Sequence, residues 1–328
     1  MSDLANIDRA VALLKAGELV GIPTETVYGL GADAANPAAV ARIFTAKGRP
    51  ADHPLIVHLP GAAHLDRWVR EIPALAYELA EAFWPGPLTL ILKRAAGVPD
   101  AVTGGQDTVG LRVPGHPVAL ALLRAFAEAG GSGGIAAPSA NRFGRISPTT
   151  AAHVREELGD AVPLVLDGGP CVVGIESTIL DLSSGRPLLL RPGHISPAAI
   201  EAVCGLMPEA PTAAAPRASG TLEAHYAPQT PMRMLPRADI PAFLCSMHDV
   251  GRRCGVLCHG GDAPTGSADV WKILPADPVG YAHDLYAALR DLDYAGVDLI
   301  VVEAIPVLAA WSAVADRLRR AVCGSGEA

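Results

Sequence analysis

Apolar residues recur along this chain with two alternating periods. Near the N-terminus they have the three-to-four-residue spacing of an amphipathic helix, at Leu4, Ile7, Val11 and Leu14. Short runs rich in branched apolar residues predict strands at 19–22, 55–59, 88–92, 109–113, 164–166, 178–182 and 188–190. Helices that alternate with short strands are typical of an α/β fold.

Several helix starts are marked by a capping residue followed by proline. Asn36-Pro37 combines a side-chain cap with proline at the first helical position, and Gly48 is a suitable end for this helix. Ser147-Pro148 and Ser196-Pro197 repeat the start signal. We therefore predict helices that begin at these three places.

The periodic pattern stops between residues 207 and 231, where prolines and alanines predominate. Such a composition predicts a semi-rigid linker. After it, a strand near Met232, strands at 255–258 and 299–302, and helices at 281–295 and at the C-terminus predict a small parallel α/β module. We predict a first domain at 1–207, a linker at 208–231 and a second domain at 232–328.

Composition and charge limit the possible functions. Half of the 328 residues are apolar, and the formal charge of −8 argues against a chain that mainly coats nucleic acid. The charged first helix does not resemble a secretory signal, and the apolar stretch at 297–311 is interrupted by Asp298, Glu303 and Pro306. We expect a soluble cytoplasmic protein without membrane or stable nucleic-acid binding.

The six cysteines do not form a disulfide pattern. Cys254 and Cys258, followed by His259, have a spacing that could suit a metal ion. A second matching pair is missing, and the run is apolar and strand-like. We therefore interpret these cysteines as core residues and predict no metal ligands in the protein.

Neither common nucleotide-binding loop is present. Residues 29–34 fit the pattern G-x-G-x-x-A, but the acidic residue expected about 20 positions later falls at Asp52, in a loop rather than at a strand end. The sequence contains no G-x-x-x-x-G-K-[ST] motif. Any nucleotide must therefore be bound by other residues.

Lys47 and Arg49 leave the end of the predicted helix on a proline-stiffened segment. If this segment is extended, the two side chains point the same way, which would suit a polyphosphate. Cations at a helix C-terminus also complement the helix dipole. The spacing alone favours neither interpretation.

Three further segments combine small and polar residues. Thr108, Gly110 and Arg112 would share one face of a strand, either as room for a ligand or as an ordinary half-exposed strand. Ser139 and Asn141 are two positions apart, so in an extended segment they would also point to the same side. A helix starting at Ser147 would present N–H groups to an anion, although capping alone explains that serine.

The third segment is the triplet Glu176-Ser177-Thr178 at the start of a strand, with Arg191 after the next strand. The triplet fits either binding of a small polar ligand or turn chemistry. Arg191 is either a phosphate contact or a surface arginine.

In this order, six segments resemble the YrdC-like threonylcarbamoyl-AMP synthases. They are Pro23-Thr-Glu-Thr-Val-Tyr-Gly-Leu, Lys47-Gly-Arg49-Pro, Phe83-Trp-Pro-Gly-Pro-Leu-Thr, the strand 108–114, Pro138-Ser-Ala-Asn141 and Glu176-Ser-Thr-Ile. The linker with Ala224-His-Tyr-Ala-Pro228 and the C-terminal module resemble the two-domain form of this family.

The resemblance implies a twisted mixed-sheet catalytic domain with a concave cavity, followed by a small Rossmann-like domain. It implies that Lys47 and Arg49 hold the ATP phosphates. The nucleotide would also contact His53, Thr108, Ser139, Asn141, Ser147, Arg191 and Tyr226. L-threonine would be surrounded by Thr26, His58, Arg112, the backbone of Ala137, and Ser177. The family commonly has asparagine where this chain has His53.

The implied reaction joins L-threonine, bicarbonate or CO₂, and ATP into threonylcarbamoyl-AMP and pyrophosphate, with Mg²⁺ on the phosphates. A separate transferase would use the product to modify a tRNA adenosine. This chemistry requires positioning and charge neutralisation rather than a protein nucleophile. A water-excluding role for the linker is a further expectation. The alternatives are a double-stranded-RNA-binding module and a hydrogenase-maturation carbamoyltransferase; the latter resembles a much longer chain with zinc modules that this sequence lacks.

Overall fold

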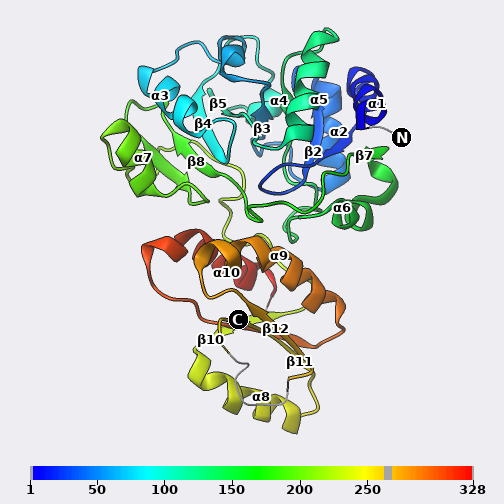
Figure 1. Ribbon diagram of the computed structural model, residues 1–328, viewed down its shortest axis with the longest axis vertical. Helices are drawn as coiled ribbons and strands as arrows, with labels where there is room; N and C mark the ends of the chain where they lie inside the picture. Colours follow the sequence, from blue (N-terminus) through cyan, green and yellow to red (C-terminus); the bar gives the residue numbers. More distant parts are fainter. Residues whose placement is uncertain (1–2, 262–267, 327–328) are drawn as a thin grey trace. The chain divides into compact units, whose positions relative to one another are not determined.

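A computed structural model describes residues 3–261 and 268–326 of the chain. By their internal contacts the residues form two compact units (Figure 1). The first contains most of the chain up to Thr221. The second contains the stretch from Leu222 onward together with two short segments, Gly144–Ser147 and Val173–Ile175. None of the described helices combines the length and the hydropathy that crossing a bilayer requires.

The first unit is built on a nine-stranded mixed sheet with the order β7-β1-β2-β6-β3-β5-β4-β8-β9. The pairs β1–β7, β3–β5 and β4–β8 are parallel, and the other neighbours are antiparallel. The strands are β1 Val20–Ile22, β2 Gly29–Asp33, β3 Ile56–His58, β4 Leu88–Lys93, β5 Thr108–Arg112, β6 Ile135–Ala136, β7 Leu164–Val165, β8 Thr178–Asp181 and β9 Leu188–Arg191.

Helices of this unit bury their apolar faces on the sheet and on one another. Leu14 and Phe126 belong to one buried cluster, because α1 packs against α5 (Figure 1). Val40 and Ile43 of α2 lie in the larger core cluster with Leu30 of β2. The helices are α1 Asp3–Lys15, α2 Pro37–Lys47, α3 Ala74–Phe83, α4 Asp100–Thr103, α5 Pro117–Glu128, α6 Ala151–Leu158 and α7 Pro197–Cys204.

The second unit has a four-stranded sheet with the order β10-β13-β11-β12, and all of its pairs are parallel. In Figure 1, α8 covers one face of this sheet, while α9 and α10 cover the other. Cys254 and Cys258 lie in the core beneath α8, with Ile240 and Leu244. The elements are β10 Met232–Leu235, α8 Ile240–Asp249, β11 Cys254–His259, β12 Val270–Leu274, α9 Pro278–Tyr294, β13 Leu299–Glu303 and α10 Ser312–Gly324.

Most local predictions are confirmed, including the α/β fold class with one mixed and one parallel sheet. All seven strands predicted before residue 207 overlap observed strands. The side chain of Asn36 accepts hydrogen bonds from the first turn of α2, and Gly48 ends that helix with a left-handed φ of 61°. Ser196 caps α7 as expected.

One local prediction is wrong, and one strand was not predicted. The helix expected to begin at Ser147-Pro148 starts at Ala151, and Thr150 caps it by accepting from the N–H of His153. The carbonyl oxygen of Pro148 instead accepts a hydrogen bond from the N–H of Tyr28, so this residue takes part in a long-range contact. The Gly-rich run at 29–34 is mainly strand β2, which the sequence did not predict.

Candidate functional site

Polar side chains form a row across neighbouring strands in the middle of the first sheet. His58 at the end of β3 is the register partner of Arg112 at the end of β5. On the next strand, β4, the hydroxyl of Thr89 lies 2.8 Å from that of Ser177, which directly precedes β8. All four side chains are buried, so the sheet register concentrates their polar groups inside an apolar layer.

The turn between β1 and β2 brings Thr26 to this row. Thr24 fixes the turn, since its hydroxyl donates to the carbonyl of Val27 at 2.6 Å and lies 2.9 Å from the hydroxyl of Thr26. Arg112 Nη1 donates to Thr26 Oγ1 at 2.9 Å. Thr26 therefore contacts Arg112, and His58 is the register partner of Arg112. The resemblance assigns these three residues to L-threonine.

Arg112 makes two further contacts with the protein. Its Nε donates to the carbonyl oxygen of Gly86 at 3.1 Å, and its Nη2 lies 2.6 Å from Glu25 Oε1. Burial, and to a smaller extent the charge of the neighbouring Arg112, lower the pKa of His58 to about 3. His58 is therefore neutral at physiological pH.

Ala137 lies directly after β6, beside the same row. Its N–H donates to the carbonyl oxygen of Ile56 at 3.0 Å. A side chain on Gly29 would approach the methyl group of Ala137 to 3.1 Å, so this part of the turn is tightly packed. A backbone contact from Ala137 to a ligand would thus use its carbonyl oxygen.

Lys47 lies in the last turn of α2 and is buried. Its ammonium group donates to the carbonyl oxygens of Ser139 and Asn141, each at 2.5 Å. Burial lowers the pKa of Lys47 well below its usual value, and the charge of Arg49 lowers it further. The two positive charges repel each other, so a negatively charged ligand beside them would be favoured.

Arg49 and His53 both pack against the Phe143 ring. The Arg49 guanidinium lies 5.9 Å from the centre of the Phe143 ring, and the His53 ring packs edge-on at 5.4 Å. Burial, and then the charge of Arg49, lower the pKa of His53. Arg49 Nη2 also donates to the carbonyl oxygen of Pro54 at 3.0 Å.

Lys47 and Arg49 do converge, but not for the reason that the sequence suggested. The segment is not extended, because Gly48 has the left-handed conformation that ends α2. The proximity of the two cations comes from a helix end and a sharp turn.

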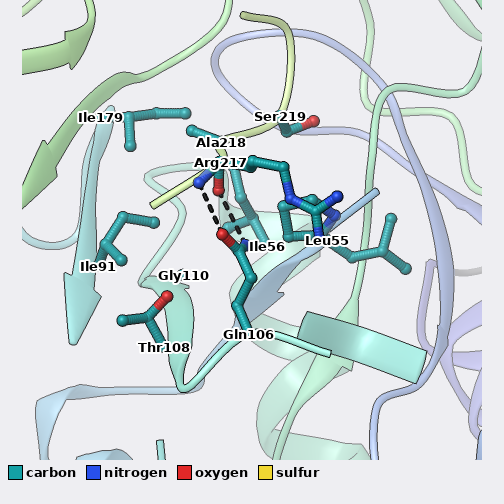
Figure 2. A pocket seen from close by; sticks show the side chains of 11 residues that line it. Leu55, Ile56, Ile91, Gln106, Thr108, Gly110, Ile179, Arg217, Ala218 and Ser219 are labelled. Carbon is teal, nitrogen blue, oxygen red and sulfur yellow. Dashed lines mark hydrogen bonds between the residues drawn. The ribbon is translucent and has the colours of Figure 1, made fainter. Parts of the chain in front are cut away.

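A small cavity lies over the sheet, and its lining includes Pro54 and Ser219, which Arg49 contacts (Figure 2). Its floor includes Ile56, Ile91 and Ile179, with Thr108 and Gly110 of β5. A methyl group at Gly110 would come within 3.1 Å of the Ile91 side chain, so glycine keeps this floor open. Thr108 and Gly110 thus face a cavity, as the strand pattern allowed, while Val109 and Leu111 pack in the core.

Residues 217–219 close one side of this cavity; we call them the 217–219 segment. The side-chain amide of Gln106 makes two hydrogen bonds with the backbone of Arg217, at 2.6 and 3.1 Å (Figure 2). The Arg217 side chain donates to the carbonyl oxygen of Gly104 at 2.9 Å and lies 3.3 Å from a carboxylate oxygen of Asp52. A part of the predicted linker is therefore docked on the first unit.

Arg191 connects the polar row to the 217–219 segment. Its Nε and Nη2 donate to the carbonyl oxygen of Ser177 at 3.1 and 2.9 Å, and its Nη1 donates to that of Ser219 at 2.8 Å. Arg49 Nη2 reaches the Ser219 hydroxyl at 3.4 Å. Ser219 thus contacts both arginines that the resemblance assigns to the nucleotide.

Two predicted nucleotide contacts, Ser147 and Tyr226, belong to the second unit. Tyr226 has a left-handed φ of 62° and is buried under the guanidinium of Arg317, which lies 5.4 Å from the ring centre. The ring of Tyr286 lies 5.8 Å away. The predicted roles of Ser147 and Tyr226 towards a nucleotide stay predictions.

Sequence reasoning missed several residues of the site. Glu25 lies within the motif that begins at Pro23, but no local sequence pattern indicated that it would face Arg112. Phe143 closely follows Ser139 and Asn141 in the sequence. An aromatic residue so near two polar ones could have been recognised as a candidate residue of the site. No local sequence pattern marked Gln106, because its hydrogen-bond partner Arg217 lies 111 positions further along the chain. Within residues 3–261 and 268–326, no three His, Cys, Asp or Glu side chains could hold a metal ion together.

Two family models match this chain. The Sua5/YciO/YrdC family model, described as telomere recombination, matches residues 12–193. A second model, described as the C-terminal domain of threonylcarbamoyl-AMP synthase, matches residues 195–323.

Similar relatives cover nearly the whole chain. The threonylcarbamoyl-AMP synthase of Bacillus subtilis is 41% identical over 327 residues, which cover 97% of this chain and 93% of the relative. That of Pyrococcus abyssi is 40% identical over 326 residues, covering 95% and 92%. The crystal structure of P. abyssi Sua5 complexed with L-threonine has a TM-score of 0.90, with 38% identity over 99% of this chain and 96% of that one.

Proposed function

This chain belongs to the Sua5/YciO/YrdC family, and from that premise we propose that it is a threonylcarbamoyl-AMP synthase acting on L-threonine, bicarbonate or CO₂, and ATP. The observation that carries the proposal is the pair of adjacent cations, Lys47 and Arg49, beside a buried polar row. The negative charge of a polyphosphate is complementary to such a pair of cations. The solved complex of a relative with L-threonine supports the second substrate.

The proposed reaction has two bond-forming steps. The amine nitrogen of threonine bonds to the carbon of CO₂ and loses a proton, which gives a carbamate. A carbamate oxygen then bonds to the α-phosphorus of ATP, and the bond from this phosphorus to pyrophosphate breaks. Neither step requires a protein nucleophile, so the protein has to hold two reactants in line and stabilise the charge that develops on the phosphates.

On this proposal Lys47 and Arg49 bind the phosphates. Lys47 is buried, and Arg49 is 7% exposed, so their interaction with an anion is weakly screened by water. Bound phosphate favours the protonated form of Lys47, whose pKa is lowered in the ligand-free protein.

The remaining assignments follow the resemblance. The nucleotide would contact His53, Thr108, Ser139, Asn141 and Arg191, with Ser147 and Tyr226 as further predicted contacts. Thr26, His58, Arg112, Ala137 and Ser177 would surround L-threonine. The described residues do not form a carboxylate cage, so we expect Mg²⁺ to arrive on the ATP phosphates, where it would neutralise their charge.

The 217–219 segment is the proposed lid of the site. Ser219 makes hydrogen bonds with Arg49 and Arg191, so the docked segment lies next to the proposed phosphate contacts. A carbamate loses CO₂ readily, and a segment that excludes water would protect it. We expect the product to pass to a separate transferase that modifies tRNA.

The test is pyrophosphate release with ATP, L-threonine and bicarbonate, each omitted in turn. Full release should require all three compounds. Lys47→Ala and Arg49→Ala should each lower the rate by at least about 100-fold, the effect expected for losing a charge-stabilising donor. Cys254→Ser, a buried position in the second unit, is the control and should keep the rate. Release that persists without threonine or bicarbonate would refute the proposal.

A further inference from the structure

Glu25 is a buried carboxylate that the proposed mechanism has not used. It lies in the turn between β1 and β2, and its side chain is 8% exposed. One oxygen, Oε1, lies 2.6 Å from Arg112 Nη2. Apart from this ion pair, neither carboxylate oxygen accepts a hydrogen bond from any residue that the structure describes. A carboxylate has lone pairs for several donors, so Glu25 retains hydrogen-bonding capacity.

Arg112 also retains donors after its chain contacts are counted. A guanidinium has five N–H groups. The Nε–H points to Gly86, one Nη1 hydrogen to Thr26, and Nη2 faces Glu25. One hydrogen on each terminal nitrogen is thus left, and the guanidinium is fixed in orientation by its three chain partners. Such a fork suits a carboxylate.

The local charge is balanced before any ligand binds. His58, the register partner of Arg112, is neutral at physiological pH because burial depresses its pKa. The single positive charge of Arg112 is therefore matched by the single negative charge of Glu25 at 2.6 Å. A buried site of this kind disfavours a ligand with net charge, since either sign would be left uncompensated.

We propose that Glu25 and Arg112 together select the zwitterionic form of an α-amino acid, with Arg112 facing its carboxylate and Glu25 facing its ammonium group. This inference rests on the proposed function, because it takes Arg112 as a residue of the threonine site. Glu25 then determines specificity: a hydroxy acid lacks the ammonium group and leaves the Glu25 oxygens unpaired. Arg112 alone would not distinguish the two ligands.

The test compares two ligands that differ only in the amino group. Binding of L-threonine and of (R)-3-hydroxybutyrate is measured by calorimetry on the full-length protein. A site built to pair with a substrate N–H rejects an analogue without it by on the order of 10⁴-fold. We expect strong discrimination in the wild type and a ratio at least about tenfold smaller in Glu25→Gln. Glu25→Asp keeps the charge and should retain most of the discrimination.

Glu303→Gln is the matched control. Glu303 is also a buried glutamate paired with an arginine, since its Oε2 lies 2.9 Å from Arg237 Nη1, but it belongs to the second unit. The same substitution there should leave the discrimination unchanged. If both Glu25→Gln and Glu303→Gln leave it unchanged, Glu25 only supports the fold around it and the inference is wrong.

Two outcomes separate this inference from the proposed function. If the wild type does not bind L-threonine, the proposed function itself fails. If it binds L-threonine but accepts (R)-3-hydroxybutyrate within about threefold, only the inference about Glu25 fails. The second measurement needs the wild-type protein alone, so it can refute the inference even if Glu25→Gln does not fold.

Discussion

Gln106→Ala tests whether a single side chain holds the 217–219 segment over the cavity. The Gln106 amide accepts from the N–H of Arg217 at 2.6 Å and donates to its carbonyl oxygen at 3.1 Å. Alanine removes both hydrogen bonds and leaves the backbone of β5 intact, because Gln106 precedes that strand. The segment would then be held by the Arg217 side chain and by the contacts of Ser219.

The size of the effect follows from these contacts. Each hydrogen bond contributes about 1 kcal/mol net, so the loss is about 2 kcal/mol. That amounts to about 30-fold more frequent opening of the segment, at roughly 1.4 kcal/mol per factor of ten. The remaining ion pair between Arg217 and Asp52 does little to compensate, because both side chains are more than half exposed.

Amide hydrogen exchange measures this opening directly. Backbone amides at 215–221 should exchange about 30-fold faster in Gln106→Ala than in the wild type, while amides of the central strands should not change. Gln229→Ala is the matched control, since the backbone N–H rather than the side chain of Gln229 is bound, to Asp293. Acceleration below about threefold at 215–221 would refute the reasoning, and a uniform acceleration would indicate global unfolding instead.

Two further predictions concern backbone geometry and pH. Gly104→Ala should lower the free energy of unfolding by more than about 1 kcal/mol, since a methyl group there would meet the Asp52 carbonyl oxygen; Gly105→Ala, also at positive φ but in open space, should cost clearly less in the same denaturant titration. His58 has a pKa lowered to about 3 in the folded protein from an ordinary 6.5. Between these values only the unfolded chain binds the proton, so stability is full above about pH 6.5 and falls as the pH drops towards 3. His58→Gln should reduce the slope of the free energy of unfolding against pH by up to about 1.4 kcal/mol per pH unit. The slope is measured by denaturant unfolding at a series of pH values, and an unchanged slope would contradict the assigned pKa.

The strands show which part of the fold a sequence can predict. The run at 88–92 consists of branched residues, and all but Thr89 are apolar, so its preference for a buried strand is local and visible. Strand β2 was missed because Gly29 and Gly31 read as loop residues. In the structure a side chain on Gly31 would meet the Ile22 side chain, so glycine is required there by the neighbouring strand.

The helix wrongly placed at Ser147 illustrates the same limit. The Ser-Pro signal is a valid local start, and the identical signal at Ser196 does begin a helix. The carbonyl oxygen of Pro148 pairs with Tyr28, however, and Thr150 takes the capping role. A long-range hydrogen bond thus prevailed over a local propensity that is weak by comparison.

By itself the sequence determined the alternation of elements, the family and the set of polar residue types available for the site. These depend on local periodicity and on contiguous motifs. Only the tertiary structure decided which residues face one another: Glu25 with Arg112, Phe143 with Arg49, and Gln106 with Arg217. Such pairs are set by strand register and by the path of the chain between distant segments, and no local pattern records either of them.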